Sequence, residues 1–134
     1  MIEVEARADV PCDLATLEST LVWACGRLGV ARASVGLMVV GEAEMTRINE
    51  RGRGKAEPTD VLAFPLDGPE ALEGWPQDGP PPELGDIVIC PAAAQDPLST
   101  LALHGLLHLV GYDHEVDAGE MLALQHKLVD EAPA

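Results

Sequence analysis

Residues 104–114 of the chain read HGLLHLVGYDH. The run before the glycine at its eighth position is mostly apolar and favours a helix, on which His104 and His108 lie one turn apart on the same face. Gly111 can adopt the left-handed conformation that ends a helix. The chain can then turn back, so that His114 approaches the other two. The stretch therefore predicts a helix that carries a cluster of three imidazoles at its end.

Three neutral imidazoles around one point form a metal-binding ligand set. Three protein ligands with an open fourth position are typical of a catalytic zinc site, whereas structural zinc sites have four ligands. We therefore expect one zinc ion on His104, His108 and His114, and nickel or cobalt could bind the same nitrogens. Asp113 either is a partner that orients one of these imidazoles or is a turn-forming aspartate.

The spacing of the histidines and the glycine matches the metzincin signature H-E-x-x-H-x-x-G-x-x-H at every position except the second. Gly105 stands where that signature has the glutamate that acts as general base. Loss of a general base typically lowers a rate by about 10²–10⁴-fold. The sequence therefore predicts a metzincin-like metal helix and argues against peptide hydrolysis.

The 134 residues suffice for one small domain, which we expect to span residues 1–134. Alternating or continuous apolar runs predict four strands, at residues 2–8, 33–40, 59–65 and 85–90. Apolar residues at helical spacing predict four helices, at residues 14–28, 41–49, 97–110 and from residue 117 onward. Segments with glycine, proline and polar residues predict loops at 51–58 and 67–83. This order predicts an α+β fold with a mixed sheet of about four strands covered by helices.

The formal net charge of −15 argues against a broad nucleic-acid-binding surface. Four of the eight basic residues, Arg47, Arg51, Arg53 and Lys55, nevertheless lie within nine positions. Either a polyanion contacts the protein locally through this segment, or the segment is a solvated loop that offsets part of the acidic excess.

The chain has no apolar run long enough to cross a membrane, and residues 1–5 lack the basic and apolar regions of a signal peptide. The three cysteines, Cys12, Cys25 and Cys90, are far apart and form no Cys-x-x-Cys pair. We therefore expect a cytoplasmic protein with reduced thiols and no membrane partner.

The block at residues 104–114 resembles the signature of the YbeY family of bacterial endoribonucleases. Residues 49–65, NERGRGKAEPTDVLAFP, resemble that family's pattern of an Asn, then Tyr-Arg, then Pro-Thr-Asp-Val-Leu-Ser-Phe-Pro. Residues 84–87, LGDI, match a third and shorter block. In order and spacing, the resemblance covers residues 45–125.

The resemblance implies a zinc-type metal on the three histidines and cleavage of single-stranded RNA. It implies roles in ribosomal RNA maturation and ribosome quality control, with RNA and the ribosome or ribosomal proteins as partners. It also implies that Arg53 is the family's functional arginine. A guanidinium in that place could stabilise the negative charge that builds on a phosphate under attack. Arg51 and Lys55 could contact neighbouring phosphates.

The chain departs from the family pattern at several positions. Ala63 replaces a usual serine, and Gly52 replaces an aromatic residue that could stack on a base. The segment between Cys90 and the first histidine is shorter by about three helical turns at 3.6 residues each, and Thr100 occupies the place of a further histidine. Two alternative functions stay open: a metal-dependent hydrolase of another substrate, and a non-catalytic metalloprotein associated with the ribosome.

Overall fold

The centre of the structure is a sheet of four strands, in a computed structural model that describes residues 1–133. The strands are β1 (Ile2–Ala8), β2 (Ala33–Val39), β3 (Val61–Pro65) and β4 (Glu83–Ile89). Their order is β1-β2-β4-β3, with three parallel strands and β3 antiparallel at one edge. The helices are α1 (Leu14–Arg27), α2 (Glu42–Arg53), α3 (Gly68–Ala71), α4 (Leu98–Leu109) and α5 (Glu120–Glu131). The expected α+β fold with a mixed sheet is confirmed.

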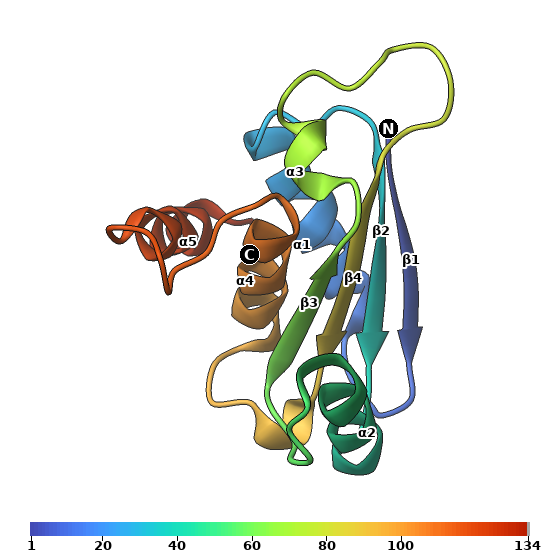
Figure 1. Ribbon diagram of the computed structural model, residues 1–134, viewed down its shortest axis with the longest axis vertical. Coiled ribbons are helices and arrows are strands. Elements are labelled where there is room, and N and C mark those ends of the chain that lie inside the picture. Colours follow the sequence, from blue (N-terminus) through green and yellow to red (C-terminus); the bar gives the residue numbers. More distant parts are fainter. Residues whose placement is uncertain (134) are drawn as a thin grey trace.

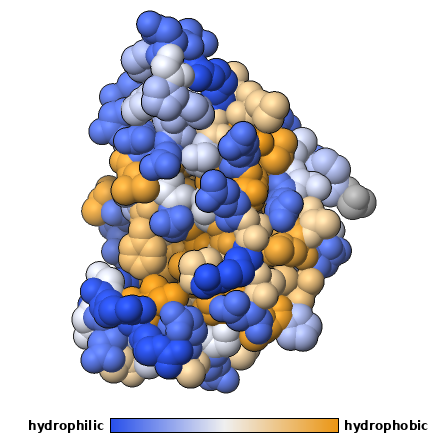
Figure 2. All heavy atoms as spheres, turned by 90° about the vertical axis from the view of Figure 1, so that its right-hand side faces the viewer, coloured by the Kyte–Doolittle hydropathy of each residue, from blue (hydrophilic) through white to orange (hydrophobic). Residues whose placement is uncertain are grey.

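Helices α1 and α4 lie side by side on one face of the sheet, and α5 packs on the far side of α4 (Figure 1). Seven residues of α4 are buried there, because its apolar side chains surround the helix on nearly all sides. Helix α2 covers the lower end of the opposite face, over a smaller apolar cluster that includes Met45, Leu62 and Val88. The side of the molecule seen in Figure 2 is hydrophilic at its two ends and carries more apolar residues between them.

The C-terminal end of α2 differs from the prediction. Residues 51–53, expected in a loop, form the last turn of this helix. The acidic residues in the first turn and the two arginines in the last turn interact favourably with the helix dipole. These interactions stabilise the helix beyond its predicted end. Gly54 then ends it in the left-handed conformation, at φ 73°, and donates its N–H to the carbonyl of Glu50. Arg51 and Arg53 are therefore fixed on a helix, about 200° apart around its axis.

The predicted loop at 67–83 contains the short helix α3, which the sequence pattern did not indicate. Gly68 begins this helix and is buried against the end of α4. A Cβ atom at this position would overlap the main-chain carbonyl oxygen of Leu109, so only glycine allows so close an approach. The loop is thereby joined to the helix that carries the histidines.

Helix α4 begins at Leu98, about two turns before His104, as the position of the preceding proline predicts. Thr100 lies in its first turn. No helix in the part of the chain that the structure describes is long and apolar enough to span a membrane.

Candidate metal centre

Helix α4 ends in a Schellman motif, which turns the chain back toward the helix. Gly111 has a φ of 106°, and its N–H donates to the carbonyl of His108 at 3.1 Å. The next N–H, that of Tyr112, donates to the carbonyl of Leu107 at 3.0 Å. The predicted role of the glycine as the end of the helix is confirmed, and the reversal brings His114 beside the two helical histidines.

The three imidazoles form a compact cluster. The ring centroids of His104 and His108 are 4.8 Å apart, and that of His114 lies 5.2 Å and 5.3 Å from them. One nitrogen from each ring lies within 4.8 Å of the others, so the three side chains are positioned to bind a metal ion. Nδ1 of His114 is buried with no hydrogen-bond partner among the described residues, and an ion in the cluster would be consistent with this otherwise costly arrangement.

A glutamine on α5 orients the first histidine. Nδ1 of His104 lies 2.7 Å from Oε1 of Gln125, so in the tautomer that donates this hydrogen bond the ring keeps Nε2 free for a metal. The sequence did not identify Gln125 as part of the site. Its only signal is its position four residues after Met121, beside the buried face of α5.

Substitution of Gln125 by alanine is expected to weaken metal affinity by about 10–100-fold, because the His104 ring loses the partner that fixes its tautomer. The dissociation constant can be measured by competition with a chelator. The matched control is His126→Ala, which removes an exposed imidazole from the same helix and should leave the affinity unchanged. Equal affinities of the two variants would contradict the role of Gln125.

The surroundings of His108 favour its neutral form. Burial lowers the pKa of this imidazole, and the nearby His104 and His114 lower it further. A hydrogen bond to the Tyr112 main chain and the charge of Asp113 oppose the shift in part. Because only a neutral imidazole can bind a metal, a lowered pKa keeps His108 ready for an ion at mildly acidic pH.

Asp113 begins the turn that carries the third histidine and ends at Asp117. Its Oδ1 accepts a hydrogen bond from the N–H of Glu115 at 3.0 Å, and its carbonyl accepts from Val116 and Asp117. These contacts agree with the turn-forming alternative. A role for this carboxylate in orienting an imidazole stays a prediction.

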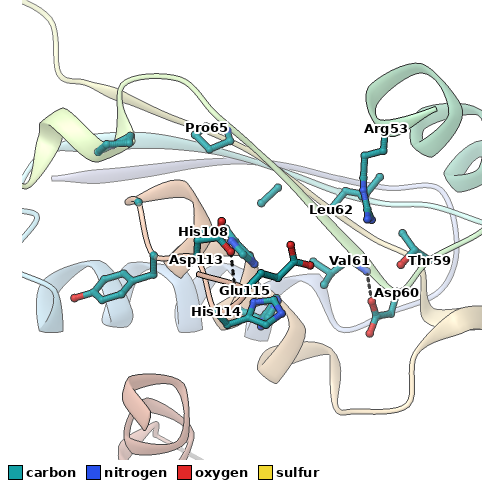
Figure 3. Close-up of a pocket in the computed structure, with 16 residues that line it drawn as sticks. Arg53, Thr59, Asp60, Val61, Leu62, Pro65, His108, Asp113, His114 and Glu115 are labelled. Carbon is teal, nitrogen blue, oxygen red and sulfur yellow. Dashed lines mark hydrogen bonds between the residues drawn. The ribbon is translucent and has the colours of Figure 1, made fainter. Parts of the chain in front are cut away.

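The histidines line a cleft of about 630 Å³ between α4, strand β3 and the end of α2 (Figure 3). Arg53 extends from α2 into this cleft, opposite the histidines. No carboxylate lies within ion-pair distance of its guanidinium in the described part of the chain. Three acidic residues, Asp60, Asp113 and Glu115, also line the cleft, so Arg53 is its one permanent positive charge among the described residues.

Arg51 and Lys55 do not line the cleft. Both are exposed, and a guanidinium nitrogen of Arg51 lies 3.9 Å from a carboxylate oxygen of Glu44. The two arginines of the last turn of α2 therefore point in different directions, and contacts of Arg51 and Lys55 with phosphates stay a prediction.

Gly105, at the position of the metzincin glutamate, packs against the sheet. A Cβ atom here would lie 2.7 Å from Cγ2 of Ile87, a fully buried residue of β4. The helix thus lies so close to the sheet that a side chain at this position would force Ile87 or the helix to shift. This close packing favours glycine over the metzincin glutamate at position 105.

The change Gly105→Ala is expected to lower the free energy of unfolding by about 1–3 kcal/mol, because the added methyl group overpacks the contact with Ile87. Urea denaturation measures this difference. The matched control is Gly26→Ala on α1, where no atom lies within 4 Å of the new Cβ, and the gain in helix propensity should stabilise the protein by about 0.5–1 kcal/mol. Two variants of equal stability would contradict the close packing at Gly105.

Comparisons with known proteins identify the family of the chain. The family model described as Endoribonuclease YbeY matches residues 14–132. An endoribonuclease YbeY of Acidothermus cellulolyticus is 44% identical over 114 residues, which cover 72% of this chain and 69% of the relative. One of Micrococcus luteus is 38% identical over 141 residues, covering 95% of this chain and 87% of the relative. A solution structure of a Thermotoga maritima protein superposes with a TM-score of 0.58 at 26% identity, covering 97% and 87% of the two chains. The chain therefore belongs to the YbeY endoribonuclease family.

Proposed function

We propose that this protein is a metal-dependent endoribonuclease that cleaves single-stranded RNA in the cytoplasm, in ribosomal RNA maturation and ribosome quality control. The observation that carries the proposal is that Arg53 and the three clustered histidines line one cleft, although about fifty residues separate them in the sequence. Membership of the YbeY family supports the same activity.

Each part of the cleft has a role in phosphodiester cleavage. A divalent cation on the histidines, zinc or alternatively nickel or cobalt, would supply Lewis-acid stabilisation of charge at the scissile phosphate. Arg53 forms no ion pair with residues 1–133 and faces the same space, so its guanidinium can hold two phosphoryl oxygens at once. The half-buried position of His104 and His108 limits access of water and strengthens these electrostatic interactions.

The distribution of charge suggests how the protein recognises RNA. With a net charge of −15 and three carboxylates in the cleft, the protein has little general attraction for a polyanion. RNA would therefore bind locally, through Arg53 and the metal. A ribosomal protein or the ribosome would supply the remaining contacts, because contacts with such a partner can hold the protein on its substrate without electrostatic attraction of RNA by the net charge.

The test is cleavage of a labelled single-stranded oligoribonucleotide by the protein with and without metal. We expect one metal ion per chain, loss of cleavage after removal of the metal with a chelator, and recovery after addition of zinc, nickel or cobalt. The same oligonucleotide in a duplex should resist cleavage. Undiminished cleavage by metal-free protein, or no cleavage by protein that carries one ion per chain, would refute the proposal.

A further inference from the structure

The edge strand β3 directs part of its main chain into the cleft. It bonds to β4 on one side only, and in an antiparallel pair every second residue directs its N–H and C=O toward the partner strand. The bond from the Leu66 N–H to the Leu84 carbonyl, 3.0 Å long, shows that the even-numbered residues face β4. Val61, Ala63 and Pro65 therefore face the open side, and all three line the cleft with the histidines.

Only one of these three positions offers a free donor. Pro65 has no N–H. The N–H of Val61 already donates to Oδ1 of Asp60 at 2.8 Å, as the dashed line in Figure 3 shows. The Ala63 N–H is thus the single outward donor of β3 that has no partner within residues 1–133.

This arrangement suits a single acceptor atom better than a peptide strand. An extended peptide that joined a sheet edge would need a row of alternating donors and acceptors. Asp60 and Pro65 remove the donors on both sides of Ala63, so such pairing is disfavoured. One rigid N–H in a cleft that also holds Arg53 matches instead an isolated anionic oxygen.

We propose that the Ala63 N–H donates a hydrogen bond to a non-bridging oxygen of the scissile phosphate. The inference rests on the proposed function and adds a catalytic group to it. The sheet holds this N–H in a fixed direction, so the donor needs no reorganisation as negative charge develops on the oxygen. No proton is transferred, because the N–H stays on the main chain while the phosphate reacts.

The position of the Ala63 side chain supports the proposal that the main-chain N–H, and not the side chain, contacts the phosphate. The methyl group of Ala63 packs against the apolar core beneath α4, whereas its N–H lies in the plane of the sheet. The donor is therefore independent of side-chain identity, and the replacement of a serine by alanine noted above leaves it intact.

Two changes remove the donor by different means. Ala63→Pro deletes the N–H, which points away from β4. An edge strand tolerates proline at such a position, and Pro65 already occupies one in this strand. Incorporation of L-lactic acid at residue 63 replaces the amide by an ester and adds no ring. We expect each to lower kcat by about 10²-fold with KM changed by less than about threefold, at unchanged metal content. The matched control is the same ester replacement at residue 61, with the hydroxy-acid analogue of valine, because the Val61 N–H already donates to Asp60 and its loss should leave most of the activity.

A sulfur substitution at the phosphate separates a direct contact from a structural effect. Each of the two non-bridging oxygens can be replaced by sulfur, which gives two phosphorothioate diastereomers. If the N–H contacts one of these oxygens, the effects of sulfur and of N–H removal on the cleavage rate should be non-additive for that diastereomer and additive for the other. A merely structural role would slow both diastereomers alike.

The wild-type protein provides a measurement that does not depend on the variants. In zinc-loaded protein, the Ala63 amide proton resonance should move downfield when a 2′-O-methyl oligoribonucleotide is added, while the Val61 amide, already bonded to Asp60, should not. An Ala63 resonance that stays in place while those of other cleft residues move, or full activity of both variants that lack the donor, would overturn the inference. Absence of cleavage by the metal-loaded wild type would instead refute the proposed function.

Discussion

His108→Ala is expected to abolish metal binding and RNA cleavage together. This residue supplies one of three ligands, and two imidazoles are too few to hold a catalytic zinc ion firmly. Without the ion, the cleft loses several kcal/mol of transition-state stabilisation, so the rate should fall by about 10³-fold or more. Metal content after dialysis and cleavage of single-stranded RNA measure the two losses.

Circular dichroism should show that the variant keeps its fold, since His108 is only half-buried and lines the cleft. His126→Ala provides the control, because it removes a histidine that is exposed on α5 and is not part of the ligand set. Retention of one metal ion per chain by His108→Ala would show that the ligands are wrongly assigned.

Arg53→Ala should lower the rate of RNA cleavage by about 10³-fold, in line with arginines that stabilise charge in phosphoryl transfer. Metal content should not change, because Arg53 belongs to α2 and not to the histidine cluster. Stability should change by less than about 0.5 kcal/mol, since the side chain is exposed and forms no ion pair in the described part of the chain. Single-turnover cleavage, metal analysis and urea denaturation check the three expectations.

The sharpest control for this prediction is Arg51→Ala. It removes the same charge from the same helical turn, but Arg51 lies outside the cleft and beside Glu44. We expect it to weaken cleavage only slightly. If both variants lose activity equally, the effect of Arg53 arises from general attraction of RNA by positive charge and not from its place in the cleft.

The histidine cluster could be predicted because everything that forms it lies within eleven consecutive residues. Helical spacing aligns His104 and His108, and Gly111 permits the reversal that brings the third ring. The sheet was predictable for a similar reason, because its strands are short runs of alternating or continuous apolar residues. These features depend on local geometry that a sequence pattern contains.

Contacts between distant elements could not be predicted in this way. The hydrogen bond from His104 to Gln125 depends on how α5 packs against α4. The closeness of Gly105 to Ile87 depends on the distance between helix and sheet. The lone donor at Ala63 becomes visible only when strand register and the bond to Asp60 are known. Local patterns contain no information on these distances, which arise from packing of the whole domain.

The contact of Gly68 with the end of α4 divides the connection between β3 and β4 into two parts, which differ in how much their length can change. Only two residues join β3 to Gly68, so an insertion there would displace either the edge strand or the glycine that touches Leu109. Beyond α3, the chain can lengthen or shorten without moving the histidine cluster. Natural variation in length and sites for a fused tag should therefore concentrate after α3, whereas the short link before it should keep its length.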